Sequence, residues 1–346
     1  MTATLQRVTR GEDITSVSPY TQQVKYIAHA LGTIGRHIKR LALLKPFHES
    51  KTATCDVHGY ILKWARQNYA GLESLRLDIE KCPLTFLSHF KSLRCFHFSG
   101  FSVTPPEETL RILNSLPQLQ HLKITGPPQD HEFHQRSGYR GQPIVQSITP
   151  MVLANLHPLR RISICELHDP FRDDAVLLSS AMLQSLTSTH SPTLESLSLT
   201  SNTTLSDPIT YQINLLLTSS PSISTLDLAF PSLPASLLHS IPPSTQTLRI
   251  LSTTPDDSSI PGLSSPEIIS ILEQRSSELC KLRELCLWRY TVPYEIDHFH
   301  GENIIEQITL PKTKKDPFEV EIKELRQRTE NLKWILRWEF WNPTGL

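Results

Sequence analysis

The chain has 346 residues, of which 38% are hydrophobic, enough to form a sizeable core. One compact core is not the default at this length, so two domains or an elongated array of repeats is expected. Lysine plus arginine and aspartate plus glutamate both number 34, so net charge gives no whole-chain reason to expect nucleic acid or an anionic membrane as partner.

Targeting signals and cysteine usage predict a cytoplasmic or nuclear protein. The first 20 residues lack the apolar core of a secretory signal, and no stretch reaches the roughly 18 apolar residues of a membrane span. The six cysteines are scattered without a C-x-x-C pair, which is typical of reduced thiols. The glycosylation sequon at Asn202 would then not meet the glycosylation machinery, so we interpret Asn202 as a structural residue.

A six-residue pattern with apolar residues at its first, fourth and sixth positions recurs along nearly the whole chain. Ahead of the first copy of this pattern, residues 18–37 predict a helix. Residues 1–36 are therefore expected to form an N-terminal tail and a capping helix. The copies are IKRLAL (38–43), LESLRL (72–77), LRCFHF (93–98), LQHLKI (119–124), LRRISI (159–164), LESLSL (194–199), ISTLDL (223–228) and LRELCL (282–287), with weaker copies TQTLRI (245–250) and IEQITL (305–310).

Each copy of this pattern predicts a short strand rather than a helix. At about 100° per residue, the three apolar positions of a helix would point near 0°, 300° and 140°, which is no single face. In a strand, the fourth and sixth positions share a face, and the first ends the preceding turn. The pattern therefore indicates strands that each bury two side chains.

Segments between the copies predict helical returns. In 105–116, Pro106 suits a first helical position, and in 264–274 we expect Ser265 as the N-cap followed by Pro266. Proline also stands one or two residues ahead of several copies, and it disfavours helical geometry in the residue before it. These prolines are Pro117, Pro158, Pro192, Pro221 and Pro243.

Strand–helix units of this size bury their apolar faces only by stacking, which predicts a solenoid with parallel strands on its concave face. The units resemble leucine-rich repeats of the ribonuclease-inhibitor type, and their irregular lengths resemble the repeat regions of fungal F-box proteins. The resemblance spans about residues 20–340. It implies an α/β horseshoe with about ten units in 37–311. The asparagine that usually follows the strand occurs only at Asn202, so no asparagine ladder is expected.

The C-terminal segment, 312–346, predicts a cap made of a helix and a strand. Asp316 is placed as an N-cap, with Pro317 at the first helical position and Glu319 closing a capping box. LKWILRWEFW (332–341) predicts a last strand, with Arg337 at a leucine position.

Alternation along the strands predicts a partner-binding concave face, because residues beside the buried positions must point away from the core. Its first half is basic and its middle is small and hydroxylic. The candidate contact residues are Arg40, Arg76, Asp78, His97, His121, Lys123, Arg161, Asp227, Arg249, Glu284 and Trp288.

This surface predicts a non-catalytic scaffold for recognition of a protein partner. The F-box resemblance implies a substrate-receptor role in ubiquitin ligation. Residues 1–18 are too short and polar to supply an F-box, so binding of the cullin-ligase adaptor is not expected from these residues. The alternative is RNA or phospho-ligand binding by the basic half, although nucleic acid is the less favoured partner because that half lacks interleaved aromatic residues.

Catalytic, cofactor and metal sites are not expected. The chain has no G-x-S-x-G, no phosphate-binding loop and only 12 glycines, which leave few places for close approach to a cofactor. His131 with His134, and His298 with His300, lack further ligands nearby, so they are interpreted as solvated loop histidines rather than zinc ligands.

Overall fold

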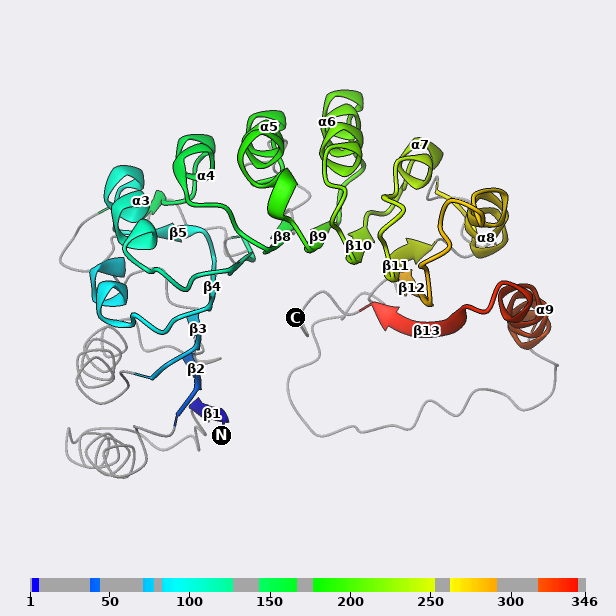
Figure 1. Ribbon diagram of the computed structural model, residues 1–346, viewed down its shortest axis with the longest axis horizontal. Coiled ribbons are helices and arrows are strands. Elements are labelled where there is room, and N and C mark those ends of the chain that lie inside the picture. Colours follow the sequence, from blue (N-terminus) through cyan, green and yellow to red (C-terminus); the bar gives the residue numbers. More distant parts are fainter. Residues whose placement is uncertain are drawn as a thin grey trace, which may run out of the picture.

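A single large parallel sheet organises the protein. The structure is a computed structural model that describes residues 2–5, 38–43, 71–77, 83–126, 143–166, 177–252, 262–290 and 317–341. The sheet has 11 strands, which follow one another in chain order with parallel neighbours, and Figure 1 shows them along a curved inner side. The strands are β1 (Thr2–Leu5), β2 (Arg40–Leu43), β3 (Ser74–Leu77), β4 (Cys95–Phe98), β6 (His121–Ile124), β8 (Arg161–Glu166), β9 (Ser196–Ser201), β10 (Thr225–Ala229), β11 (Thr247–Ser252), β12 (Glu284–Tyr290) and β13 (Ile335–Trp341).

The helices form a second layer on the outer side of the sheet (Figure 1). A separate two-stranded sheet is formed by β5 (Phe101–Ser102) and β7 (Val145–Gln146), which are antiparallel. None of the described helices combines the length and the apolar character that crossing a membrane requires. The helices are η2 (Leu84–His89), α3 (Pro106–Asn114), α4 (Pro150–Asn155), α5 (Ser180–Thr189), η5 (Ser191–Thr193), α6 (Asp207–Thr218), α7 (Ala235–His239), α8 (Ser265–Gln274) and α9 (Pro317–Asn331).

The expected mixed α/β architecture with a parallel sheet is confirmed. Every copy of the six-residue pattern from 38 to 287 coincides with a strand, including the weaker copy at 245–250. The weak copy at 305–310 and the helix expected in 18–37 lie outside the described residues. The pattern does not predict β1, because Thr2–Leu5 lie outside every copy of it.

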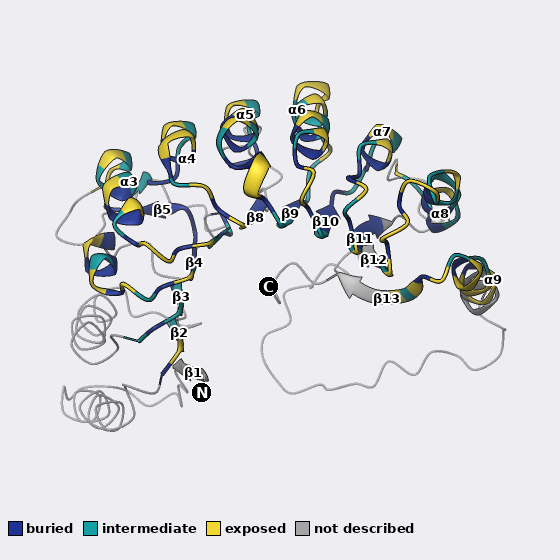
Figure 2. Ribbon diagram, viewed as in Figure 1, coloured by how far each residue is buried: buried dark blue, intermediate teal, exposed yellow. Residues whose placement is uncertain are grey.

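Apolar side chains from successive strands stack in register to form the core. In one row Leu75 aligns with Phe96 and then Leu122, and in the next Leu77 aligns with Phe98 and then Ile124. All these side chains are buried in one continuous cluster that also takes in the inner sides of the helices, which Figure 2 shows in dark blue. Each unit therefore completes the core of the unit before it.

A ladder of backbone hydrogen bonds aligns the strand entries. At each step the carbonyl of the second pattern residue accepts two N–H groups of the next unit, as when the Glu73 and Ser74 nitrogens both donate to the Lys39 oxygen at 2.9 Å. The same arrangement recurs up to the Gln246 oxygen, which accepts from Arg283 and Glu284. Because this ladder uses only the backbone, the entries remain regular without a repeated asparagine side chain.

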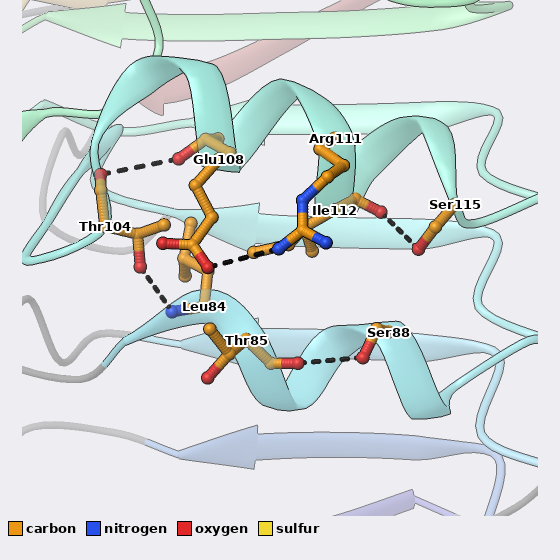
Figure 3. Close-up of polar contacts among 9 residues, drawn as sticks. Leu84, Thr85, Ser88, Thr104, Glu108, Arg111, Ile112 and Ser115 are labelled. Carbon is orange, nitrogen blue, oxygen red and sulfur yellow. Dashed lines mark hydrogen bonds and ion pairs between the residues drawn. The ribbon is translucent and has the colours of Figure 1, made fainter.

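Polar side chains tie consecutive helical returns to one another. Figure 3 shows the Thr104 hydroxyl, just ahead of α3, accepting a hydrogen bond from the Leu84 nitrogen at the start of η2, at 2.7 Å. Further along, His190 at the end of α5 accepts from the Leu159 nitrogen through Nδ1 at 3.1 Å and donates from Nε2 to the Leu153 oxygen at 3.0 Å. Both bonds require the neutral imidazole with its proton on Nε2.

The predicted helix starts are confirmed with one correction. Pro106 occupies the first position of α3, as expected. In α8 the N-cap is Ser264 rather than Ser265. The reason is the capping box, since Glu267 lies three residues after Ser264 and accepts from both the Ser264 nitrogen, at 2.8 Å, and its hydroxyl, at 2.6 Å.

The position expected for Arg337 is wrong by one residue. Arg337 aligns with Cys286, whereas Leu336 and Trp338 align with the core residues Leu285 and Leu287. Helix α9 does begin at Pro317, but it ends in a Schellman turn, in which the Trp334 nitrogen donates to the Thr329 oxygen at 2.9 Å. The turn places one more residue ahead of β13 than the sequence pattern assumes. Because side chains alternate between the two faces of a strand, this shift of one residue moves Arg337 from the core face to the inner face.

This turn generates a stability prediction at Lys333. Its φ is 60°, in the left-handed region that costs a non-glycine residue about 1–2 kcal/mol. We expect Lys333→Gly to raise the free energy of unfolding by a few tenths to about 1 kcal/mol, because glycine adopts this conformation without strain but is more flexible when unfolded. Urea denaturation measures the change. Lys333→Ala, which keeps a Cβ, should not stabilise the protein, and equal effects of the two substitutions would contradict the prediction.

Candidate binding surface on the inner face of the sheet

Two rows of polar residues cross the inner face, on the side of the sheet away from the helices (Figure 1). Each strand of the large sheet from β2 to β13 contributes its third pattern residue to the first inner row and its fifth to the second inner row. The first inner row is Arg40, Ser74, Cys95, His121, Arg161, Ser196, Thr225, Thr247, Glu284 and Ile335. The second inner row is Ala42, Arg76, His97, Lys123, Ser163, Ser198, Asp227, Arg249, Cys286 and Arg337.

Most of the candidate contact residues lie in these rows with accessible side chains. Arg40 and Arg161 are exposed. Asp78 lies outside the described residues, and Trp288 is placed only by its backbone, which aligns with Leu251. The half-buried members are Arg76, His121, Lys123, Asp227, Arg249 and Glu284.

Cations in the C-terminal half of the face are paired across neighbouring strands. Arg249 on β11 contacts Asp227 on β10 at 3.2 Å, and Arg337 on β13 contacts Glu284 on β12 at 3.1 Å. Sequence reasoning missed the second pair because it assigned Arg337 to the core face. These two ion pairs balance the charges of the two inner rows from β10 to β13.

The N-terminal half of the face has a different charge balance. From β2 to β8 the two inner rows contain Arg40, Arg76, Lys123 and Arg161 but no aspartate or glutamate. We call these four residues the basic half-face. Its strands are adjacent in the sheet, so these positive charges lie on one continuous stretch of surface.

Two histidines lie among the cations of the basic half-face. His97 aligns with Arg76 on one side and Lys123 on the other, and it is only 7% exposed. Burial, followed by the charges of Lys123 and Arg76, lowers the pKa of His97 to about 3. Its Nε2 is buried without a hydrogen-bond partner among the described residues. His97 is thus a buried neutral group rather than the surface contact expected from alternation.

The second histidine forms a pair with a cysteine that could suggest nucleophilic chemistry. The Sγ of Cys95 lies 3.4 Å from Nδ1 of His121 on the next strand. Burial raises the pKa of the Cys95 thiol, and burial together with Arg161 lowers the pKa of His121 to about 4. Both groups therefore stay neutral near pH 7, whereas an activated nucleophile needs a thiolate.

Among the side chains that the structure describes, most residues at the seventh pattern position are buried, and Thr125 is half-buried. Alternation predicts that Ser99 and Thr200 point outward, yet both are buried. Cys165 at the same position is also buried, and burial raises the pKa of its thiol to about 11. Across the described residues, the accessible inner face therefore consists mainly of the two inner rows.

Metal ligands do not gather in the described part of the chain, which contains no group of three or more histidine, cysteine, aspartate or glutamate residues able to hold an ion. His131, His134, His298 and His300 lie outside the described residues. No protein-family model matches this chain, and a comparison with curated proteins found no match.

The buried histidines generate a prediction about pH. His97, His121 and His190 have folded-state pKa values of about 3, 4 and 4, below the ordinary 6.5. The unfolded chain therefore binds more protons below pH 6.5, and stability present above that pH is lost as the pH falls towards 4. We expect a lower free energy of unfolding in urea at about pH 5 than at about pH 7.5.

Substitution separates the contribution of one histidine from acid effects in general. His97→Gln removes one titrating group. The free energy of unfolding of this variant should therefore change less between about pH 5 and about pH 7.5 than that of the unchanged protein. His239→Gln on the exposed side of α7 is the matched control. If the free energy of unfolding of His97→Gln depends on pH as steeply as that of the unchanged protein, the assignment of His97 as a buried neutral group is contradicted.

Proposed function

We propose that the chain is a leucine-rich-repeat solenoid that acts as a non-catalytic scaffold for recognition of a protein partner. The observation that carries this proposal is the double row of half-exposed polar side chains on the inner face. Parallel strands in register present such rows at regular intervals, so the face is both rigid and chemically varied. Solenoids use extended surfaces of this kind for binding.

The arrangement of the layers supports binding through this face. Among the described elements, α3 to α9 all lie on the outer side of the sheet (Figure 1). The middle of the inner face, from β8 to β10, presents the small hydroxylic side chains of Ser163, Ser196, Ser198 and Thr225. Small side chains leave room for a partner to approach the sheet. The neutral Cys95–His121 pair supports recognition over catalysis.

A steric block tests whether the inner face binds. Ser196→Tyr with Ser198→Tyr fills the middle of the face irrespective of charge, because both residues point away from the core. Gln184→Tyr with Ser188→Tyr on α5 adds the same bulk to exposed positions of the outer layer. We expect proximity labelling in cells to lose its specific partners with the inner-face variant alone.

Circular dichroism and urea denaturation check that both variants fold. Partners retained by the inner-face variant and lost by the α5 variant would contradict the proposal and move the binding site to the outer layer. If both variants retain the cellular partners equally, the middle of the inner face is not part of the binding site.

The role in ubiquitin ligation implied by the resemblance to F-box repeat proteins stays a prediction. It is checked by purifying the protein from cells and probing for the cullin-ligase adaptor. Co-purification that survives the Ser196→Tyr/Ser198→Tyr block would support a substrate-receptor role, since the adaptor would bind elsewhere. Recovery of inner-face partners without the adaptor would contradict that role and leave the recognition scaffold.

A further inference from the structure

We propose that His190 makes one joint of the sheet sensitive to acid: when its imidazole takes up a proton, the entries of β8 and β9 separate before the rest of the sheet opens. We call the contacts between these two units at the strand entries the β8–β9 joint. It supports the middle of the inner face, where Ser163 on β8 aligns with Ser198 on β9. The inference goes beyond the proposed recognition function and does not depend on it.

The His190 side chain closes the β8–β9 joint from inside the protein. It lies at the end of α5 and is fully buried, with 0% exposure. Its Nδ1 accepts a hydrogen bond from the Leu159 nitrogen at the entry of β8, at 3.1 Å, and its Nε2 donates one to the Leu153 oxygen on α4, at 3.0 Å. One ring therefore connects the return that leads into β9 with both the helix and the strand entry of the unit before it.

The two hydrogen bonds of His190 cannot both survive protonation. A backbone N–H can only donate, so Nδ1 must keep its lone pair for the Leu159 nitrogen. A proton taken up from solvent would bind at Nδ1, and two N–H groups would then face each other inside the protein. The Leu159 N–H would be left buried without an acceptor, which is a costly state that opening to water relieves.

Two threonines beside His190 also form hydrogen bonds across the joint, and neither titrates. The Thr189 hydroxyl donates to the Ala154 oxygen at 2.9 Å, and the Thr193 hydroxyl donates to the Leu159 oxygen at 2.9 Å. Among these three side chains, the response to acid therefore depends on the histidine. Because each stacked unit contacts only its neighbours, one weakened joint can open while the others stay closed.

Burial is the main cause that keeps His190 neutral. It lowers the pKa of His190 to about 4, the hydrogen bond to the Leu153 oxygen opposes this shift, and the charge of His157, which follows α4, adds to it. The helices α4 and α5, which are neighbours in the outer layer (Figure 1), contain no titratable side chain of their own.

Other charged groups near the joint are paired or exposed. At the strand entries, Arg160 and Glu195 form an ion pair at 2.8 Å, so their charges offset each other. On α6, which packs against α5, the titratable residues Asp207 and Tyr211 are both exposed. None of these groups replaces the acceptor that the Leu159 N–H loses.

The direction of the effect follows from the pKa of His190 in the two states of the joint. It is about 4 in the closed joint and the ordinary 6.5 for an imidazole that the open joint exposes. The open joint therefore binds more protons below pH 6.5, and the stability of the closed joint, fully present above that pH, is lost as the pH falls towards 4. Between about pH 7.5 and about pH 5, these values favour opening on the order of 25-fold.

Hydrogen exchange on the full chain, read by NMR, tests the joint amide by amide. After correction for the intrinsic exchange rate, opening at the Leu159 amide should increase by at least about tenfold between about pH 7.5 and about pH 5. The amides of Glu195 and Ser196, which donate to the Arg160 oxygen in the same joint, should follow it.

The joint between β10 and β11 is the internal control. Its amides at Gln246 and Thr247 donate to the Ser224 oxygen in the equivalent arrangement, without a buried histidine among their partners. Their opening should change less than about threefold over the same range of pH.

Substitution assigns the effect to His190. His190→Asn keeps an oxygen that can accept from the Leu159 nitrogen but does not titrate, so opening at Leu159 should change less than about threefold between the two pH values. His239→Gln on the exposed side of α7 is the matched control and should keep the full increase.

The unchanged protein supplies a measurement that needs no variant to fold. In an NMR titration, the ring of His190 should be neutral with its proton on Nε2 at about pH 7.5. The amide resonance of Leu159 should move with the same midpoint as the ring, because the two groups share one hydrogen bond.

Three outcomes would overturn the inference. Opening at Leu159 keeps its full increase in His190→Asn, the amides of Gln246 and Thr247 respond as strongly as the β8–β9 joint, or the ring of His190 titrates without a change at Leu159. The second outcome would mean that acid loosens the whole sheet rather than one joint.

Discussion

The structure depends on parallel strands that stack in register, each completing the core of its neighbour. Two constraints impose this register together. The fourth and sixth pattern residues, such as Leu197 and Leu199, must lie in the apolar rows, and the carbonyl of each second pattern residue must accept two N–H groups from the next unit. A slip of one residue would turn every core side chain of that strand towards the inner face, so both constraints oppose it.

The inner face follows from the same constraint, because residues between the buried positions have only one other side to occupy. Register places each of them beside a defined neighbour on the next strand. Where a carboxylate meets a guanidinium, as at Asp227 and Arg249, the surface becomes neutral. Where Arg76 and Lys123 flank His97 on the neighbouring strands, burial and their charges keep the pKa of the histidine low and its imidazole neutral. The chemistry of the inner face is thus a consequence of which residues the register makes neighbours.

Much of this organisation is predictable from the sequence, because the six-residue pattern and the prolines encode strand, turn and return locally. The inner rows follow from alternation, and Arg40 and Arg161 lie accessible as expected. Burial of His97 is not predictable in this way, since it depends on neighbouring strands in space. The shift at Arg337 depends on the left-handed turn at Lys333, and a lysine there carries none of the usual glycine signal. β1 lies outside every copy of the pattern and was not predicted.

Cysteine accessibility along β9 tests the register most directly. Single cysteines at positions 196, 197, 198 and 199 are labelled with a maleimide under native conditions, and site-specific labelling is read by mass spectrometry, which separates them from the native thiols. In-register stacking predicts rapid labelling of Ser196→Cys and Ser198→Cys and protection of Leu197→Cys and Leu199→Cys until the protein unfolds. Uniform labelling, or protection at 196 and 198 instead, would contradict the arrangement of core and inner face.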